Sequence, residues 1–538
     1  MVSLQSIGDS SQLIVNGKPF LILGAELHNS TASTLNFLEP IWPKLVDYHI
    51  NTVFLPVSWE QVEPEQGKFD FGLLDGIIEK ARSYNLKLVL LWFGSFKNAE
   101  SGYIPEWMKI QPKKYPRSVI LKEGKLVVSK TLSVFHEANV DADANAVSAL
   151  MDHLKLVNHD ETVIMVQLEN ESGVLWDSRD RSEEATKWYE KQVPEKLLEY
   201  LTTHPKAEAF TRRFPDFPKV STGTWKEIFG EGVHGDEIFM AWHYALYIEK
   251  IAAAAKSRYQ IPLYVNAALN MPDSRPKKSQ RLPGQYPCGG ALGHTMDVYR
   301  AAGNNIDIYA PDMYWKEFEE TAVAFRHGGN PLLVPETRRD FYAAERLFYA
   351  YGACKAIGVS PFGIDSVWEE SALFKKHYGV ISQVSDQILK SQRENTIFGF
   401  HFSDEPVADG IVHRFPSGLI AHIERIHSYG EPQTGFGLIM QTSDEEFLGI
   451  GYGFTVQFSS VSGRRPEILK CIEGHFPNGE WETTRRLNGD ETASMSRWQF
   501  ASVTPDYGDY KVPLCYPATT GISKIRVYLH EDIYESFP

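Results

Sequence analysis

Short apolar runs alternate with longer helical segments through the first roughly 400 residues, and this alternation constrains the fold more than any other feature. Eight such runs occur, at residues 20–24, 51–57, 86–92, 163–168, 262–266, 306–309, 332–334 and 359–364. Each run is mostly apolar instead of alternating and leads into a polar loop, which is typical of strands buried on both faces of a parallel sheet. Eight such β/α units predict an α/β fold, a (β/α)₈ TIM barrel with insertions.

Two local patterns refine this prediction. Residues 12–15 and 20–24 flank Asn16-Gly17, a strong hairpin signal, so a β-hairpin is expected to precede the barrel. A doubly wound sheet is the alternative fold, and it would be favoured by G-x-G-x-x-G after an early strand. No such motif occurs there.

The pattern changes after His401, where the helical periodicity ends. Segments of β type follow at residues 435–441, 446–458, 481–487 and 524–529, separated by Gly, Ser, Thr and Asp. This pattern predicts a C-terminal all-β sandwich. We therefore expect two domains: a barrel with its N-terminal hairpin over residues 1–400, and a β-sandwich over residues 401–538.

Composition excludes several classes of function. The 538 residues carry a net charge of −15, which argues against a nucleic-acid partner because such a partner needs a basic face. The four cysteines form no C-x-x-C pair, and no apolar run approaches the roughly 20 residues that a membrane span needs. The N-terminus shows no basic segment followed by an apolar core, so the chain as given is expected to be cytoplasmic. Secretion is the alternative if an export signal was removed.

Carboxylates follow two of the runs, where a barrel places its reactive groups. The fourth run leads into Glu169, Asn170 and Glu171, and Glu336 follows the seventh run. In a regular strand Glu169 and Glu171 would share one side and Asn170 would point to the other. A solvated loop, or a carboxylate at a helix N-terminus, would explain either site alone.

Taken together, the two sites indicate a reaction. Strands four and seven lie across the barrel mouth, so Glu171 and Glu336 can converge. A pair of carboxylates facing one cleft is what glycoside hydrolysis requires, one as general acid and one as nucleophile. The geometry of the strand ends favours the short separation that is typical of retaining enzymes.

The chain resembles glycoside hydrolase family 35, the β-galactosidases, and within it a subgroup with an additional C-terminal β domain. The resemblance is carried by GAELHNS (24–30), NTVFLPVSWEQVEPEQGKFDF (51–71), WFGSFKNAESGYIPEWM (92–108), MVQLENESG (165–173) and LLVPETR (332–338). It implies that Glu171 is the acid/base and Glu336 the nucleophile, that Asn170 binds the sugar 2-hydroxyl, and that Tyr314 hydrogen-bonds the nucleophile. Glu169 would then be a supporting carboxylate.

The resemblance also implies a retaining exo-β-glycosidase that releases terminal β-D-galactose. Two segments depart from the family pattern: LPVSWE replaces a YVFWN-like segment after the second strand, and Gly94–Asn98 replaces an Ala-Glu-Trp-Asn element after the third. Those loops contact sugar hydroxyls in relatives. Cleavage of β-glucosaminides, β-glucosides or α-arabinopyranosides is therefore the alternative, and a non-catalytic carbohydrate-binding barrel is the alternative of another class.

Further substrate-binding candidates follow the runs. They are Trp59, Trp92, Asn98, Trp315 and Trp368. Barrel-mouth packing competes with sugar stacking for Trp59 and Trp92, and capping of the loop competes with hydroxyl binding for Asn98. Without H-x-x-x-H, an EF-hand or a compact Asp cluster, no metal and no cofactor are expected. The expected partner is a carbohydrate with a terminal β-linked sugar, and a homo-oligomer is compatible with the sequence.

Overall fold

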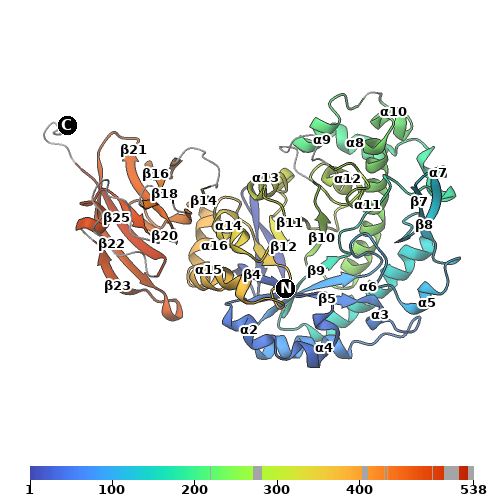
Figure 1. Cartoon of the computed structure of the whole chain (residues 1–538), viewed down its shortest axis with the longest axis horizontal. Coiled ribbons are helices and arrows are strands. Elements are labelled where there is room, and N and C mark those ends of the chain that lie inside the picture. The colour runs from blue at the N-terminus through green and yellow to red at the C-terminus, as the bar shows by residue number, and fades with distance from the viewer. Residues whose placement is uncertain are drawn as a thin grey trace. The chain divides into compact units, whose positions relative to one another are not determined.

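The computed structural model describes residues 1–218, 220–270, 281–402, 410–428, 431–432, 434–487, 489–501 and 520–530. The chain divides into two compact units (Figure 1). The first comprises Met1–Arg338 and Ile357–Trp368, and the second Arg339–Ala356 and Glu369–Pro538. The second unit includes three helices that precede residue 401, because helix α14 packs on strands β14 and β19 of that unit.

The first unit is built on a closed parallel barrel, which confirms the predicted fold. Its strands follow one another in the order β10-β11-β12-β13-β4-β5-β6-β9. They are β4 (Ile22–Glu26), β5 (Thr52–Ser58), β6 (Lys87–Phe93), β9 (Val163–Leu168), β10 (Leu263–Ala268), β11 (Ile308–Met313), β12 (Leu333–Thr337) and β13 (Gly358–Pro361). Each overlaps one of the eight predicted runs, and nearly every strand residue is buried, as expected for strands covered on both faces.

Helices surround this barrel. The longest are α4 (Gly72–Ser83), α6 (Glu137–Val157) and α11 (Val233–Arg258), and the shorter ones are α1 (Leu35–Leu38), α2 (Trp42–Asp47), α3 (Trp59–Val62), α5 (Glu106–Lys109), α7 (Glu183–Tyr189), α8 (Glu195–Thr203), α9 (Glu208–Arg213), α10 (Trp225–Phe229), α12 (Met296–Ala302) and α13 (Phe318–Ala324). Helix α4 shows the principle: Leu74, Ile77, Ile78 and Ala81 recur at helical spacing and form its buried face.

Two hairpins lie outside the barrel strands. The predicted N-terminal hairpin is formed by β2 (Ser10–Val15) and β3 (Lys18–Phe20). Strand β1 (Ser3–Ile7) pairs with β2 and extends the hairpin to a three-stranded sheet. Its turn is Asn16-Gly17, both with positive φ as a tight hairpin requires. The second hairpin, β7 (Arg117–Lys122) with β8 (Lys125–Leu132), is an insertion that the sequence patterns did not indicate.

The second unit combines helices α14 (Phe341–Gly352), α15 (Ala372–Ser382) and α16 (Ser385–Glu394) with antiparallel sheets. The sheets confirm the predicted C-terminal β domain, and the three helices before residue 401 lie with them in this unit. The six-stranded sheet runs β14-β19-β20-β25-β22-β23, the four-stranded sheet runs β15-β16-β21-β24, and β17 pairs with β18. The strands are β14 (Ile397–His401), β15 (Gly410–Arg414), β16 (Leu419–Arg425), β17 (His427–Ser428), β18 (Glu431–Pro432), β19 (Phe436–Gln441), β20 (Glu446–Tyr452), β21 (Phe454–Ser460), β22 (Pro466–His475), β23 (Glu482–Leu487), β24 (Trp498–Phe500) and β25 (Ile522–Leu529).

One core joins the two larger sheets. Phe447 and Ile525 come from the six-stranded sheet and Phe454 and Trp498 from the four-stranded sheet, and all belong to one buried cluster. The predicted strand 446–458 is split at Gly453, where φ is +77° and a Cβ would lie 1.9 Å from a backbone carbonyl oxygen. Only glycine fits such a corner.

The four cysteines lie far apart in the sequence. Cys288, Cys354 and Cys471 are buried, and Cys515 lies outside the described residues. Within the described ranges, no helix has the length and apolar character needed to cross a bilayer.

Candidate functional site

Three carboxylates meet at the C-terminal end of the barrel. Glu171 follows β9, Glu336 lies in β12 and Asp312 lies in β11. One carboxylate oxygen from each lies within 4.8 Å of the others. The convergence expected of the fourth and seventh strands is therefore present, and Asp312 joins it. The sequence reasoning missed Asp312, although a charged residue inside the apolar segment 306–315 was an available signal.

Glu336 is buried and accepts hydrogen bonds from three side chains. The Asn170 and Asn266 amides donate to its Oε1, each at 3.2 Å, and the Tyr314 hydroxyl donates to its Oε2 at 2.7 Å. The contact expected of Tyr314 is thus observed. Donors of this kind stabilise the negative charge of a carboxylate. Burial and the Glu336 charge raise the pKa of Tyr314, so its hydroxyl keeps the proton that it donates.

Asn266, which sequence reasoning also missed, hydrogen-bonds all three acidic residues. Besides Glu336, its amide nitrogen donates to Asp312 Oδ2 at 2.7 Å, and its Oδ1 accepts the Glu171 backbone N–H at 3.0 Å. Its signal in the sequence was its place as the last residue of the fifth run. An amide can serve all three because it offers two donors and one acceptor on one rigid plane.

Glu171 and Asp312 are poised to hold protons. Burial raises the pKa of Glu171 to about 7; the charge of Glu336 acts in the same direction and that of Lys97 opposes it. Burial also raises the pKa of Asp312 well above its usual range, with Glu336 and Glu171 adding to the effect. A hydrogen bond joins Glu171 and Asp312; it lowers the pKa of Glu171 and raises that of Asp312, so Asp312 is the donor.

The backbone after β9 turns Asn170 and Glu171 toward this cluster. The strand ends at Leu168, and φ is +61° at Glu169 and +47° at Glu171. These left-handed conformations break the alternation expected of a regular strand. As a result Glu169 points elsewhere and accepts the backbone N–H groups of Ser95 and Phe96. Glu169 thus supports the loop after β6, as the resemblance implied, while Asn170 reaches Glu336.

Lys97 is a further residue that the sequence did not single out. It is buried in the loop after β6, and its ammonium donates to Asn170 Oδ1 at 2.9 Å. Asn98 and Ala99 form the tip of a two-residue turn with positive φ, closed by hydrogen bonds between the Lys97 and Glu100 backbones. Asn is favoured in such turns, so Asn98 has the turn role, and a contact of its side chain with a sugar hydroxyl stays a prediction.

The tryptophan candidates take packing roles. Trp59 and Trp92 have no exposed surface, and their indole N–H groups donate to Glu63 at 2.7 Å and Asp143 at 2.9 Å. A ring without exposed surface offers no face to a sugar, which corrects the platform expectation for both. The reason is their position at strand ends, where the rings fill the space between the barrel and its loops.

Trp315 and Trp368 lie in different surroundings. Trp315 follows Tyr314, is half-buried and lies 5.3 Å from the Arg281 guanidinium, so a substrate contact there stays a prediction. Trp368 packs edge-on against Tyr48 at 4.8 Å and lies near the Lys44 ammonium. Its observed partners therefore belong to helix α2 and the residue that follows it, and none of them belongs to the carboxylate cluster.

Carboxylates at this spacing could also surround a metal ion. Ligands to a metal must be deprotonated, whereas the raised pKa values of Asp312 and Glu171 favour the protonated form of both groups. The observed pairing therefore suits proton transfer better than metal binding, and the expected absence of a metal stays a prediction.

This fold and site define the chain as a (β/α)₈ barrel with a carboxylate cluster at its C-terminal mouth and an appended β domain. Residues 12–224 match the sequence model of glycosyl hydrolases family 35, and residues 374–498 match a domain of unknown function, DUF5597. The chain is thus similar to this family over residues 12–224, the region that contains four of the five motifs quoted above.

The chain is similar to two curated relatives. A β-galactosidase, "Beta-galactosidase 14" of Arabidopsis thaliana, is 26% identical over 192 residues, covering 34% of this chain and 19% of the relative. A β-galactosidase of Xanthomonas manihotis is 27% identical over 168 residues, covering 30% of this chain and 25% of the relative. The matched part thus spans a quarter or less of either relative.

Similar solved structures include β-galactosidases from Bacillus circulans sp. alkalophilus and from Marinomonas ef1. The Bacillus enzyme has a TM-score of 0.46 at 15% identity, covering 69% of this chain and 57% of its own. The Marinomonas enzyme has a TM-score of 0.46 at 12% identity, covering 69% and 61%.

Proposed function

We propose that the chain is a retaining exo-β-glycosidase that removes terminal β-D-galactose from oligo- or polysaccharides. One observation carries the proposal: two carboxyl groups in different environments share one site. Glu336 accepts three hydrogen bonds, whereas burial raises the pKa of Glu171 to about 7. A carboxylate that accepts hydrogen bonds and a carboxyl group that keeps its proton can serve as nucleophile and acid.

The reaction then proceeds in two displacements. A Glu336 oxygen attacks the anomeric carbon, the glycosidic C–O bond breaks, and Glu171 gives its proton to the departing oxygen. In the second step Glu171 takes a proton from water, the water oxygen attacks the anomeric carbon, and the bond to Glu336 breaks. Carboxylate oxygens within 4.8 Å support this route, because inversion needs roughly 6.5–9.5 Å between the carboxyl groups to admit a water.

The neighbouring residues have positioning roles in this proposal. Asn170 uses one amide hydrogen on Glu336, and its carbonyl oxygen is held by Lys97. The second amide hydrogen remains to donate to the sugar 2-hydroxyl, a contact that strengthens in the transition state. Asp312 returns a hydrogen bond to Glu171 when that group has lost its proton.

The sugar preference is tested separately from the mechanism. The loop after β6 places Lys97 where relatives carry an Ala-Glu-Trp-Asn element, and this departure favours another β-glycoside as the second candidate. A panel of nitrophenyl β-galactoside, β-glucoside, β-glucosaminide and α-arabinopyranoside separates the candidates. We expect the galactoside to give the highest kcat/KM, and a larger value for another sugar would replace the galactose assignment.

The stereochemistry of the first product tests the mechanism. Proton NMR during the early phase of hydrolysis is expected to show the β anomer first, followed by mutarotation. First appearance of the α anomer would mean inversion. A Glu336→Gln variant that turns over sugars as the wild type does would contradict the assigned mechanism.

A further inference from the structure

A cavity lies apart from the carboxylate cluster. It has a volume of about 380 Å³ and is lined by the start of α6, the middle of α11, and residues 134, 135, 188, 191, 192, 194 and 225. None of its lining residues lies in a barrel strand, and none belongs to the carboxylate cluster. The sequence candidates do not include it, and the proposed mechanism does not use it.

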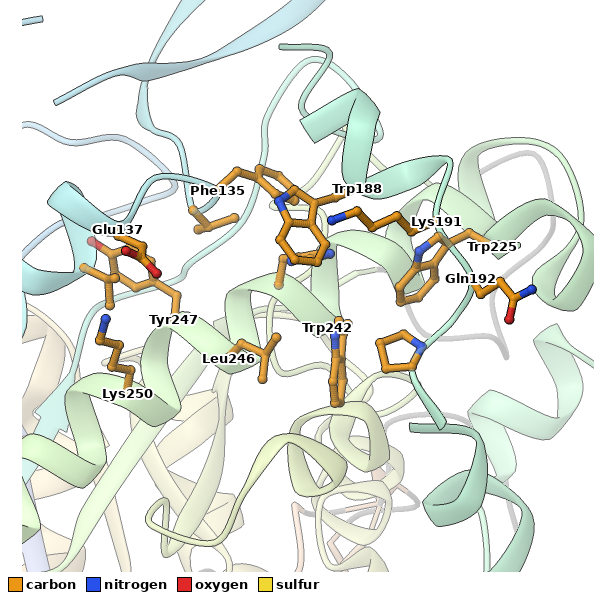
Figure 2. Close-up of a pocket in the computed structure, with 14 residues that line it drawn as sticks. Phe135, Glu137, Trp188, Lys191, Gln192, Trp225, Trp242, Leu246, Tyr247 and Lys250 are labelled. Carbon is orange, nitrogen blue, oxygen red and sulfur yellow. The ribbon is translucent and has the colours of Figure 1, made fainter. Parts of the chain in front are cut away.

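Aromatic rings form the walls of this cavity. Figure 2 shows Trp188 and Trp242 on opposite sides of the space, with Trp225 toward one end. Trp188 is 39% exposed, whereas Trp225 and Trp242 are buried and therefore fixed in place. The Lys191 ammonium lies 3.4 Å from the centroid of the Trp188 ring. The C–H faces of a sugar ring pack well on indole rings at a half-wet site of this kind.

A neutral histidine stands among these rings. His243 contacts Phe135 at 4.5 Å, Trp188 at 5.7 Å and Trp225 at 6.2 Å between ring centroids. Burial lowers the pKa of His243 to about 3, with the charge of Lys191 acting in the same direction. Its imidazole therefore presents one N–H donor and one acceptor. Within the described part of the chain it has no hydrogen-bond partner.

Polar side chains complete the rim. Figure 2 shows Glu137 and Lys250 at one end of the cavity, and Lys191 and Gln192 toward the other. The Glu137 and Gln192 side chains have no hydrogen-bond or ion-pair partner among the residues that the structure describes. Both signs of charge are present, and the interior group is neutral. Aromatic walls with a few convergent polar groups are the usual make-up of a small-molecule site.

We infer that this cavity is an accessory binding site for an uncharged hexopyranose unit of an oligosaccharide. The choice of a sugar as ligand rests on the proposed function. Trp188 provides the stacking face, His243 exchanges a hydrogen bond with a ring hydroxyl, and the rim residues reach the remaining hydroxyls. Tyr247 also lines the cavity and its hydroxyl shares a hydrogen bond of 2.7 Å with Ser95, so the cavity adjoins the loop that carries Lys97.

Calorimetric titration of the Glu336→Gln protein with a β-1,4-linked galactotetraose tests this site, because that variant prevents turnover. We expect two binding events, one of which disappears in the double variant with Trp188→Ala and persists with Trp188→Phe. Val412→Ala, at an exposed position of the second unit, is the matched control and leaves both events unchanged. Thermal unfolding checks that each variant is folded.

Kinetics provide a second readout. In otherwise wild-type protein, Trp188→Ala is expected to raise KM for a galactan about tenfold, from the loss of aromatic stacking, and to leave kcat/KM for nitrophenyl β-galactoside unchanged. Identical titrations with and without Trp188 would overturn the inference. So would Trp188-dependent binding of an anilinonaphthalene sulfonate dye that the tetrasaccharide does not displace, because the cavity would then serve an apolar ligand.

The two proposals fail in different ways. A protein that hydrolyses no β-glycoside but binds the tetrasaccharide through Trp188 keeps the accessory site and loses the proposed function. A protein that hydrolyses β-galactosides and is indifferent to Trp188 keeps the proposed function and loses the accessory site.

Discussion

At the scale of single residues, the position of one proton governs the site. Glu171 and Asp312 share a hydrogen bond, and the negative charge of Glu336 disfavours a second charge beside it. A carboxyl group with a pKa near neutrality is suited to give a proton to a leaving group and take one back from water. Asn266 donates to the Asp312 and Glu336 carboxyl groups and accepts the Glu171 backbone N–H, so it links all three residues.

The pKa of about 7 predicts the alkaline limb of the pH profile. As the pH rises through about 7, Glu171 loses the proton that it must donate, so kcat/KM should fall. Glu171→Gln should remove this limb. It should also lower kcat/KM about 10²–10⁴-fold for alkyl galactosides and much less for nitrophenyl galactosides, whose leaving group needs no protonation. A wild-type profile that stays flat to pH 9 would contradict the assignment of Glu171.

Lys97 should act on both the rate and the pH profile. Its charge lowers the pKa of Glu171 and its ammonium holds Asn170, so Lys97→Met should move the alkaline limb to higher pH. Loss of a charged hydrogen bond should also reduce kcat/KM roughly ten- to hundredfold. Lys109→Met, which removes a partly exposed lysine paired with Glu60, is the matched control and should change neither quantity. A limb that moves to lower pH would refute this role.

At the scale of elements, the site depends on how strands end. The eight barrel strands could be predicted because burial on both faces leaves a continuous apolar run in the sequence. The turn at Glu169–Glu171 could not, because nothing in the letters ENESG marks two non-glycine residues as left-handed. Asn266 and Asp312 were missed for a related reason: their hydrogen-bond partners lie on other strands and are not apparent from the local sequence.

The loop after β6 leaves no room for a side chain at its first residue. A Cβ on Gly94 would lie 2.3 Å from the Trp92 indole nitrogen and 2.8 Å from Glu169 Oε1. Trp92 is fixed by Asp143, so Gly94→Ala should displace the loop that carries Lys97. We expect a loss of about 1–3 kcal/mol in the free energy of unfolding, together with lower kcat. Gly102→Ala, where a Cβ meets nothing within 4 Å, is the control, and equal behaviour of the two variants would contradict this account.

At the scale of the whole molecule, the barrel contains buried carboxyl groups that make its free energy of unfolding depend on pH. Glu26, at the end of β4, is fully buried, and neither of its carboxylate oxygens has a hydrogen-bond partner within the described ranges. Burial raises the pKa of Glu26 well above 4.5, and Glu336 adds to the effect. The folded protein therefore holds a proton that the unfolded chain releases as the pH rises, and stability is lost in that direction.

Glu26→Gln removes this dependence. The stability of the variant relative to the wild type should rise with pH above about 4.5, by at most about 1.4 kcal/mol per pH unit. Thermal unfolding of both proteins between pH 5 and pH 9 measures the difference. Glu65→Gln, at an exposed position that pairs with Lys68, should show no such trend. A difference that shrinks with rising pH would contradict the buried, protonated state of Glu26.

The central claim is that Glu336 forms a covalent bond to the sugar while Glu171 handles the proton. Trapping with a 2-deoxy-2-fluoro-β-galactoside bearing a dinitrophenyl leaving group, followed by peptide mass spectrometry, tests it directly. The account predicts one sugar per chain, attached to the peptide that contains Glu336 and absent from Glu336→Gln. A label on Asp312 or Glu171, or an active protein that is never labelled, would contradict it.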